Sequence, residues 1–464
     1  MNHYFDAIVI GAGQAGPALA ARLAQAGMKT ALIERGQLGG TCVNDGCTPT
    51  KTLVASARAA HVVRYAARFG VVTGVANGAA AVSVDMRAVK ARKDAVVAES
   101  VAGLTTWLGG LTNLTVFRGT ARFVGALRLQ VGDAELAAPK IFINVGGRAT
   151  VPDWPGIHDV PVLTNTSMMD LDVLPEHLVI VGGSYIGLEF AQMYRRFGSR
   201  VSVVEASARL IGREDAEVSD AVRVILEGEG VAIHVGARNL VVARDAAGVR
   251  VAFDIEGAAK SVAGSHLLVA VGRTPNTDGL GLEAAGVALD ARGFIVVDDE
   301  LRTSAPGVWA LGDVNGKGAF THTSYNDFEI VAANLLDGGA RRVSDRVATY
   351  ALYTDPPLGR IGMSEAEVRA SGRAARVATL PMRRVARARE RGETAGFMKV
   401  LVDAQTDRIL GAALLGIEAD EVVQLLLLAM AADLPYTRIQ QTMWIHPTVS
   451  ELLPTLFNGL EPLT

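Results

Sequence analysis

The sequence predicts an α/β protein with two similar α/β domains of the doubly wound type and a C-terminal α+β domain. Two observations predict the repeated domain: a glycine-rich turn follows an apolar run at residues 11–16 and again at residues 182–187. A third observation predicts the C-terminal domain, because short alternating stretches such as Phe397–Val402 replace that pattern after Tyr350. The chain has 464 residues, which is enough for two or three domains.

The composition excludes several classes of protein. Half of the residues are hydrophobic and 20% are charged, which excludes a disordered chain. There are 45 Lys and Arg against 48 Asp and Glu without a basic stripe, so nucleic acid is not an expected partner. Apolar stretches such as Leu425–Ala432 are too short to span a membrane, and the N-terminus lacks the basic start of a signal peptide. Two cysteines are too few for a secreted disulfide scaffold, so we expect a cytoplasmic protein.

The first glycine-rich turn lies in a segment ordered as in a Rossmann-like dinucleotide-binding domain. An apolar run at residues 7–10 leads into Gly-Ala-Gly-Gln-Ala-Gly at residues 11–16, where an alanine-rich helical stretch begins. A second apolar run at residues 30–33 ends at Glu34. This order of strand, GxGxxG turn, helix, strand and acid is more specific than the glycines alone. A plain glycine-rich turn is the alternative interpretation.

Each position of this motif has a physical reason. Gly11 permits the tight turn, Gly13 lets the backbone approach a pyrophosphate, and Gly16 lets the helix pack on the strand. The helix N-terminus then faces the phosphates. Glu34 is placed to accept hydrogen bonds from ribose hydroxyls.

The same order returns in the second unit. An apolar run leads into Gly-Gly-Ser-Tyr-Ile-Gly at residues 182–187, and the next apolar run ends at Glu205. The first glycine and the acid are 23 residues apart in both units, from 11 to 34 and from 182 to 205. Gly182 and Gly187 keep the outer glycines, whereas Ser184 replaces the middle one. The equal spacing predicts two dinucleotide sites.

The segments after the second unit return to the first fold and then leave it. The expected strand Leu267–Val271 closes with Gly272, and a strand from Gly307 ends in Gly312-Asp313. A long apolar helix around Val422–Ala432 makes the C-terminal domain suited to an interface. We expect a first dinucleotide-binding domain at 1–148, a second at 149–273, a return of the first domain at 274–345 and the C-terminal domain at 346–464.

The only cysteines are Cys42 and Cys47, just before an expected helix at Thr50–Arg68. On a straight helix, residues five apart have Cα atoms roughly 8–9 Å apart, whereas a disulfide needs about 4.4–6.8 Å. A redox disulfide therefore requires a distorted segment, which Gly46 and Pro49 permit. The alternatives are two structural thiols or half of a zinc site. No nearby Cys or His pair completes a zinc site, so we expect no bound metal.

The string Gly-Gly-Thr-Cys-x4-Cys-x-Pro-x-Lys at residues 39–51, after the first glycine motif, resembles the class I pyridine nucleotide–disulfide oxidoreductases. This family includes dihydrolipoamide dehydrogenase, glutathione reductase and mercuric reductase. The resemblance covers essentially the whole chain. It includes both glycine motifs, Gly312-Asp313 and His-Pro-Thr-Val-Ser-Glu at residues 446–451.

The resemblance implies a path for electrons. FAD occupies the first fold and NAD(P)H the second, with a redox disulfide beside the flavin. Cys47 is then the thiol next to the flavin and Cys42 the thiol that attacks the substrate. Lys51 lies near the flavin and pairs with Glu189, unless it is an ordinary exposed helix cation.

Further roles follow from the same resemblance. Asp313 bonds the ribityl chain, and Tyr185 covers the nicotinamide pocket until NAD(P)H displaces it. His446 and Glu451 form an acid–base dyad, although Thr448-x-x-Glu451 also reads as a helix capping box. The role of His322 stays open between flanking the flavin and simple packing. The expected cofactor-binding residues are Gly11, Gly13, Gly16, Glu34, Thr41, Lys51, Gly119, Asp313, Gly182, Tyr185, Gly187, Glu205 and Gly272.

The acceptor stays open at this point: a small disulfide, an oxidised thiol species or a metal ion. Mercuric reductases usually carry a C-terminal cysteine pair, which this chain lacks, yet its active-site string resembles theirs. Glu205 favours NADH, because a carboxylate repels a 2′-phosphate, although Arg209 tempers this expectation. The resemblance implies a homodimer in which His446 serves the other subunit's site. A flavin- and NAD-binding redox sensor without turnover is the alternative function.

Overall fold

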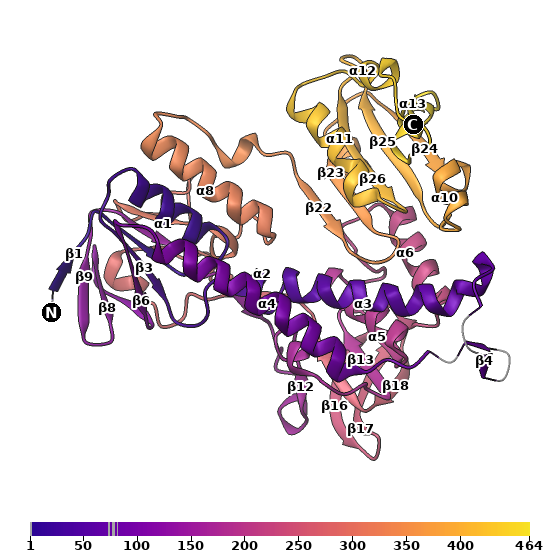
Figure 1. Cartoon of the computed structure of the whole chain (residues 1–464), viewed down its shortest axis with the longest axis horizontal. Coiled ribbons are helices and arrows are strands. Elements are labelled where there is room, and N and C mark those ends of the chain that lie inside the picture. Colours follow the sequence, from indigo (N-terminus) through magenta and orange to yellow (C-terminus); the bar gives the residue numbers. More distant parts are fainter. Residues whose placement is uncertain (1, 73–74, 77–78, 81) are drawn as a thin grey trace.

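The computed structural model describes residues 2–72, 75–76, 79–80 and 82–464. Figure 1 shows two α/β domains and a C-terminal domain, with helix α3 (Cys47–Tyr65) lying between the second domain and the C-terminal domain. Over these described ranges, no helix is both long enough and apolar enough to cross a membrane.

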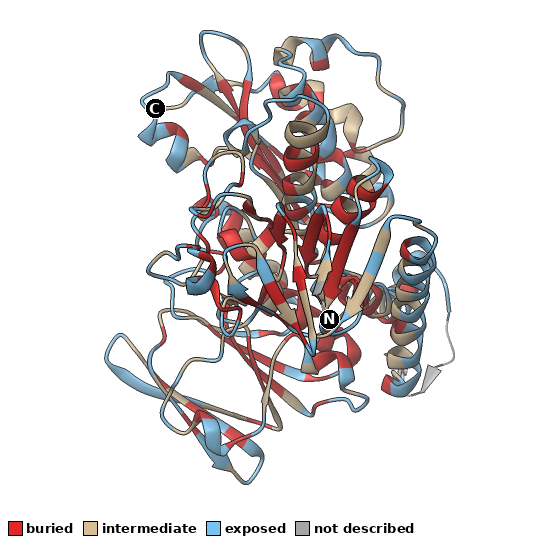
Figure 2. Cartoon of the chain, turned by 90° about the vertical axis from the view of Figure 1, so that its left-hand side faces the viewer, coloured by how far each residue is buried: buried red, intermediate tan, exposed pale blue. Residues whose placement is uncertain are grey.

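The first domain is built on a five-stranded parallel sheet of order β21-β10-β2-β3-β6. Its strands are β2 (Ala7–Ile10), β3 (Thr30–Glu34), β6 (Leu114–Arg118), β10 (Ile141–Ile143) and β21 (Val308–Ala310). β2 and β10 are buried along their whole length, as is typical of strands covered on both faces. Figure 2 shows buried strands in the interior of the molecule. Helices α1 (Ala15–Gln25) and α8 (Thr321–Leu336) pack side by side in this domain (Figure 1). Because β21 joins this sheet, the chain returns to the first domain after the second.

The second domain repeats this design with a parallel sheet of order β12-β19-β13-β14-β15. Its elements are β12 (Val162–Leu163), β13 (His177–Val181), α5 (Tyr185–Phe197), β14 (Arg200–Val204), α6 (Ala216–Gly228), β15 (Ala232–His234) and β19 (His266–Val269). An antiparallel sheet of β16 (Arg238–Asp245), β17 (Gly248–Ile255) and β18 (Ala258–Gly264) is inserted before β19. The strand expected at Leu267–Val271 ends at Val269, because the chain turns away at the half-exposed Val271 and at Gly272 with its φ of +140°.

The C-terminal domain is an antiparallel sheet covered by helices. Its six strands have the order β22-β23-β26-β25-β24-β27, and β26 is buried along its whole length. Helix α11 packs on β23 and β26. The elements are β22 (Thr349–Leu352), β23 (Leu358–Gly362), α9 (Glu365–Ala370), β24 (Ala375–Pro381), α10 (Ala386–Glu390), β25 (Phe397–Asp403), β26 (Ile409–Leu415), α11 (Ala419–Ala431), α12 (Tyr436–Gln441), α13 (Leu453–Phe457) and β27 (Glu461–Pro462).

The segment with the two cysteines differs from its expected form. Cys42 lies in a short helix, α2 (Gly40–Asn44), and Cys47 is the first residue of α3, which begins before Thr50 and ends at Tyr65. The break between the two helices falls at Asp45 and Gly46, and a Cβ on Gly46 would lie 2.7 Å from the carbonyl oxygen of Thr41. Pro49 lies within the first turn of α3, where a helix tolerates proline. The distortion therefore comes from Gly46 and not from Pro49.

The remaining elements complete the first domain and its border with the second. Helix α4 (Met86–Gly109) runs against α3, and its N-cap Asp85 accepts hydrogen bonds from two backbone N–H groups. The other elements are β1 (Asn2–Tyr4), β4 (Val75–Ala76), β5 (Ala79–Ala80), β7 (Ala121–Gly125), β8 (Arg128–Val131), β9 (Ala134–Ala137), β11 (Gly147–Ala149), β20 (Arg273–Pro275) and α7 (Leu282–Ala285).

Candidate functional site

The two glycine turns hold their acidic residues in the same way. One Glu34 oxygen accepts a hydrogen bond from the backbone N–H of Ala12 at 2.7 Å, and the other accepts one from Gly36 at 2.7 Å. Glu205 repeats both contacts, with Gly183 at 2.6 Å and with the backbone N–H two residues after itself at 2.6 Å. Each carboxylate is therefore fixed beside its glycine turn, with oxygen lone pairs left to bind ribose hydroxyls.

The glycines at the ends of each turn are required by close backbone approach. A Cβ on Gly16 would lie 2.1 Å from the carbonyl oxygen of Gly11, and one on Gly187 would lie 2.0 Å from that of Gly182. Helix α1 therefore packs directly on the turn after β2, and α5 packs on the turn after β13. This packing places the first N–H groups of both helices at the turn, where they face a bound phosphate.

One cavity of about 2890 Å³ runs past both glycine turns and both cysteines. Typical pockets for one small ligand measure about 300–1,000 Å³, so this cavity has room for two dinucleotides. One buried polar atom beside it, Oδ1 of Asn44, has no hydrogen-bond partner within the described part of the chain. The expected site residues that line it are Gly11, Gly13, Glu34, Thr41, Cys42, Cys47, Lys51, Gly119, Gly182, Tyr185, Glu189, Glu205, Gly272 and Asp313. The space, the glycine turns and the unpaired oxygen of Asn44 fit bound FAD and nicotinamide dinucleotide.

The two thiols lie close together and are electrostatically unequal. A hydrogen bond from Cys42, a hydrogen bond with Thr321 and the charge of Lys51 together lower the pKa of Cys47 to about 6, against the opposing effects of burial and of Glu189. The Sγ of Cys47 lies 3.1 Å from the Oγ1 of Thr321. The same hydrogen bond to Cys47, with burial, raises the pKa of Cys42. These shifts favour ionisation of Cys47 over ionisation of Cys42.

Lys51 lies one turn after Cys47 on α3 and is paired. Its Nζ is 2.7 Å from Oε2 of Glu189, and it lies 4.4 Å above the ring of Tyr353. The other oxygen of the buried Glu189 accepts a hydrogen bond from the backbone N–H of Tyr353 at 3.0 Å. The Lys51–Glu189 contact that the resemblance implies is present, and Lys51 is not an unpaired surface cation.

Asp313 has a cation beside it that the sequence analysis did not include in the site. Nε of Arg273 lies 3.4 Å from Oδ2 of Asp313. Burial nevertheless raises the pKa of Asp313, with Arg273 acting in the opposite direction. Arg273 follows Gly272 directly, so its place after a strand-end glycine was the signal that could have identified it.

His322 packs against two neighbours and also lines the cavity, so both expected roles stay open. Its Nε2 lies 2.7 Å from the carbonyl oxygen of Thr349, and its ring stacks on Phe320 with centroids 5.3 Å apart. Burial lowers the pKa of His322, so the ring is neutral around pH 7. The contact with Thr349 joins α8 to β22, whereas Phe320 is the N-cap residue of α8 itself.

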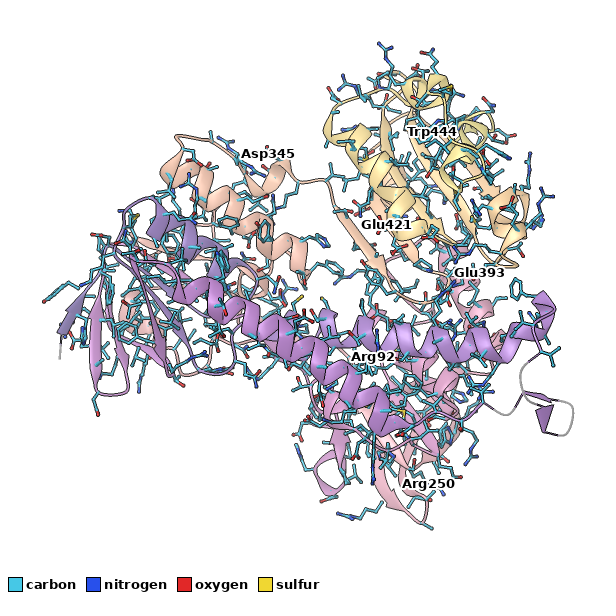
Figure 3. The ribbon with its side chains drawn as sticks, viewed as in Figure 1. Arg92, Arg250, Asp345, Glu393, Glu421 and Trp444 are labelled. Atoms are coloured by element: carbon cyan, nitrogen blue, oxygen red, sulfur yellow. The ribbon has the colours of Figure 1, made fainter. Side chains whose placement is uncertain are left out.

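His446 and Glu451 form the expected pair at a distance from the cavity. Nδ1 of His446 is 2.9 Å from Oε2 of Glu451, while the Glu451 backbone N–H donates to Oγ1 of Thr448 at 3.2 Å. The dyad and the capping contact therefore coexist. The His446 side chain is 74% exposed, and neither residue of the pair lines the cavity. Trp444, two residues earlier, lies on the far side of the C-terminal domain from α3 (Figure 3).

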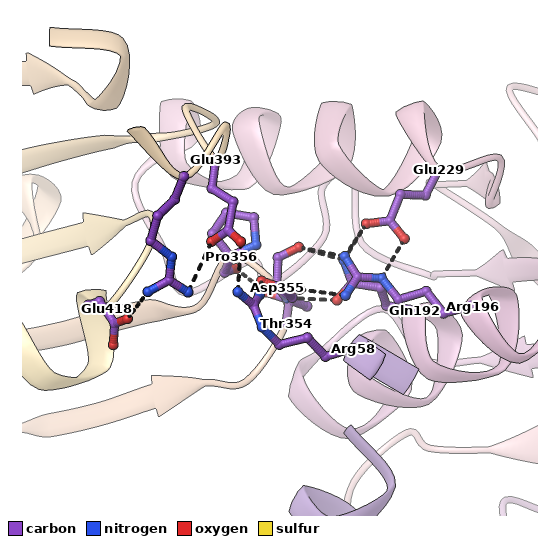
Figure 4. Close-up of polar contacts among 10 residues, drawn as sticks. Arg58, Gln192, Arg196, Glu229, Thr354, Asp355, Pro356, Glu393 and Glu418 are labelled. Carbon is purple, nitrogen blue, oxygen red and sulfur yellow. Dashed lines mark hydrogen bonds and ion pairs between the residues drawn. The ribbon is translucent and has the colours of Figure 1, made fainter. Parts of the chain in front are cut away.

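A buried polar cluster that the sequence analysis missed fastens the site helices together. Arg196 on α5 forms ion pairs with Glu229 at 2.7 Å and with Asp355 at 2.5 Å, and Asp355 also pairs with Arg58 on α3 at 2.5 Å (Figure 4). Arg58 continues to Glu393 of the C-terminal domain at 2.7 Å. These contacts hold the cysteine-bearing helix against the helix that follows the second glycine turn. They join residues far apart in sequence, so no local pattern could reveal them.

Comparison with known proteins identifies the family. Residues 5–327 match the family described as pyridine nucleotide-disulphide oxidoreductase, and residues 348–457 match its dimerisation domain. The chain belongs to this family. Its members use FAD and NAD(P)H, so the chain is an FAD-dependent pyridine nucleotide–disulfide oxidoreductase. The dimerisation domain supports a homodimer.

Several relatives align along nearly their whole length. The chain is 39% identical to the probable pyridine nucleotide-disulfide oxidoreductase RclA of Escherichia coli, with 99% of each chain covered. It is 35% identical to a mercuric reductase of Streptomyces lividans, with 97% of this chain and 94% of that protein covered. It is 33% identical to a dihydrolipoyl dehydrogenase of Chlamydia muridarum, with 97% and 96% covered. A solved Cu(II) complex of RclA, described as an HOCl-induced flavoprotein disulfide reductase, superposes with a TM-score of 0.87 at 38% identity, covering 97% of this chain and 99% of that one.

Proposed function

We propose that this chain is an NADH-dependent reductase of small disulfides or other oxidised thiol species, with an active site shared between two subunits. Two observations together carry the proposal: the unequal thiols Cys42 and Cys47, and a His446–Glu451 pair that lies outside the cavity of its own chain. Bound FAD supplies two-electron transfer between nicotinamide and the cysteine pair. The two redox thiols suit the reducing cytoplasm.

The cysteine pair accounts for the chemistry on the acceptor side. In the reduced pair, the Cys42 thiolate attacks one sulfur of the acceptor disulfide, forms a mixed disulfide and releases one thiolate. Cys47 then attacks the Cys42 sulfur, releases the second thiolate and restores the Cys42–Cys47 disulfide. Two electrons from NADH reduce this disulfide again. In sum, one NADH and one proton convert one disulfide into two thiols.

The raised pKa of Cys42 explains why an acid–base residue is needed. Cys42 holds the proton that Cys47 lacks, so it must lose this proton before it attacks. A neutral imidazole accepts such a proton near pH 7 and returns it to the leaving thiolate. Glu451 orients the ring through the 2.9 Å contact to Nδ1 and leaves Nε2 free for this exchange.

The shared site follows from where the parts lie. His446 is exposed in this chain, next to the very exposed side chains of Met443 and Ile445. An isologous dimer buries such an apolar surface and presents His446 to the cavity of the other subunit. We therefore propose that each site combines Cys42 and Cys47 of one chain with His446 of the other.

We propose NADH as the preferred donor because Glu205 is held rigidly at the end of β14. Both of its oxygens accept backbone hydrogen bonds, so it cannot turn away from a 2′-phosphate. Repulsion between the carboxylate and that phosphate then selects NADH.

A metal ion is the second candidate acceptor, and the relatives favour it specifically. Solved structures of RclA include Cu(II) complexes, among them one of a mutant in which serine replaces a cysteine, and mercuric reductases align with the whole chain. Two thiols of which one is ionised are suitable ligands for a soft metal ion. Reduction of a bound ion by electron transfer does not require protonation of a leaving thiolate.

His446→Ala distinguishes the two candidates. The FAD-loaded dimer is assayed with NADH and either a small disulfide or Cu(II), and a synthetic dye that accepts electrons directly from flavin serves as the control. We expect the variant to lose at least tenfold in kcat/KM for the disulfide and to keep dye reduction. If the wild-type protein reduces Cu(II) but no disulfide, the disulfide proposal is wrong and a metal ion is the acceptor.

A further inference from the structure

Glu214 is a buried carboxylate to which no role has yet been assigned. It lies just before α6, and its side chain is 0% exposed. Its Oε1 accepts hydrogen bonds from the hydroxyl groups of Tyr350 at 2.6 Å and Tyr185 at 3.3 Å. Its Oε2 has no hydrogen-bond partner among the residues that the structure describes and lies 3.6 Å from Nη1 of Arg360. Burying a carboxylate costs free energy unless it is paired and hydrogen-bonded. The two tyrosine hydroxyls and Arg360 supply these partners for Glu214.

The groups that fix Glu214 come from the C-terminal domain. Tyr350 belongs to β22, and the buried Arg360 belongs to β23. Arg360 also pairs with Asp215 at 3.2 Å, and Asp215 lies 3.3 Å from Nζ of the buried Lys399 on β25. The carboxylate of Glu214 is thus held in place by the antiparallel sheet of the dimerisation domain.

The group that Glu214 holds in turn belongs to the second dinucleotide domain. Tyr185 is the first residue of α5 and lines the cavity. Its ring meets Tyr350 edge-on with centroids 5.5 Å apart and Phe320 edge-on at 6.1 Å. Phe320 and Tyr350 stack in parallel at 5.4 Å, which makes a rigid wall behind Tyr185. The ring of Tyr185 therefore rests against this wall, and its hydroxyl is tethered to Glu214 and also contacts the Tyr350 hydroxyl.

We propose that Glu214 is a positioning residue that tethers Tyr185 in its place over the nicotinamide part of the cavity. Through Tyr350 and Arg360, the dimerisation domain sets how readily the dinucleotide enters. This inference rests on the proposed function and on the role that the family resemblance implies for Tyr185, as the cover of that part of the cavity. When Tyr185 moves aside, its hydrogen bond to Glu214 breaks. The free energy of this hydrogen bond therefore opposes dinucleotide binding.

The test measures NAD⁺ binding to the oxidised, FAD-loaded dimer by titration calorimetry, so it does not depend on turnover. Glu214→Gln weakens the tether by removing its charge, and Tyr185→Phe removes it while keeping the ring. Loss of one long hydrogen bond to a carboxylate predicts binding that is about threefold to tenfold tighter in either variant. Because both changes affect the same contact, the double variant should bind no tighter than the single variants.

A matched control and a third variant separate the possible failures. Glu217→Gln changes a carboxylate of the same charged cluster, which pairs with Lys399 and touches neither tyrosine, so NAD⁺ binding should stay unchanged. Tyr185→Ala removes the cover itself and should tighten binding at least as much as Tyr185→Phe. If only Tyr185→Ala tightens binding, Glu214 does not position Tyr185 and the inference is wrong. If Tyr185→Ala also leaves binding unchanged, the proposed role of Tyr185 fails and the inference fails with it. Should Glu214→Gln not fold, Tyr185→Phe still decides, since it removes the same hydrogen bond without a buried change of charge.

Discussion

Replacing Thr321 by valine tests why the two thiols are unequal. Valine keeps the shape of threonine and removes the hydroxyl that lies 3.1 Å from the Cys47 sulfur. A hydrogen bond to a charged group contributes about 1.5–3 kcal/mol. Because Cys42 still donates a hydrogen bond to the Cys47 sulfur in the variant, the lower end of this range applies. One pKa unit corresponds to about 1.36 kcal/mol, so the pKa of Cys47 should rise by about one unit.

The assay follows alkylation of each cysteine by mass spectrometry as a function of pH in the reduced protein. The lowered pKa of Cys47 means that its reactive thiolate persists as the pH falls from neutral and is lost through a midpoint of about 6. In Thr321→Val this midpoint should move to about 7, because the thiolate has lost a donor. Thr48→Val is the matched control, since the Thr48 hydroxyl has no hydrogen-bond partner in the described structure and lies next to Cys47 in sequence. A midpoint that stays near 6 in Thr321→Val, or that moves equally in Thr48→Val, would refute this account of the thiolate.

Three further predictions concern the cysteine pair, the nucleotide preference and the shared site. Cys42→Ser should abolish disulfide reduction while flavin reduction by NADH continues, and stopped-flow absorbance measures both reactions. Full turnover in this variant would show that the disulfide is not catalytic. Wild-type kcat/KM should be higher for NADH than for NADPH, and Glu205→Ala should narrow this difference in kcat/KM. A wild-type preference for NADPH would contradict NADH as the preferred donor. Cys42→Ser and His446→Ala homodimers should each be nearly inactive towards a disulfide, whereas co-expressed heterodimers contain one intact site and should regain up to half of the wild-type activity. Heterodimers as inactive as either parent would rule out the shared site.

The parts of the fold that depend on local pattern were predictable from the sequence. Residues 7–34 and 177–205 each contain a strand, a glycine turn, a helix and a second strand, and the structure places all of these elements. The reason is physical: continuous apolar strands, close-packing glycines and a terminal acid are constraints that act over a few residues. The domain boundaries at 148, 273 and 345 stay predictions, because they depend on how segments join across the fold.

The cysteine segment shows where local reasoning was misleading. The expected helix begins at Thr50 and Pro49 is expected to permit a distortion, yet proline is tolerated in a first turn and the helix begins at Cys47. The decisive constraint is the contact between Gly46 and the backbone of Thr41, which only the folded backbone reveals.

Residues that act from distant segments left no signal in the sequence. Thr321 reaches Cys47 from 274 positions away, and Tyr350 reaches Glu214 from 136 positions away. Such contacts depend on how β22 and α8 pack against the two dinucleotide domains. The family resemblance supplied Lys51, Glu189 and the His446–Glu451 pair because each lies in or beside a recognisable motif, and it could not supply contacts outside those motifs.

Anaerobic titration with NADH, combined with counting of free thiols, tests the central claim most directly. The protein is purified with FAD in its oxidised form, one equivalent of NADH per chain is added, and alkylated cysteines are located by mass spectrometry. We predict that both Cys42 and Cys47 become alkylated after NADH and that neither is alkylated before it. A flavin that is reduced by NADH while both cysteines remain in their starting state would contradict electron transfer through this pair.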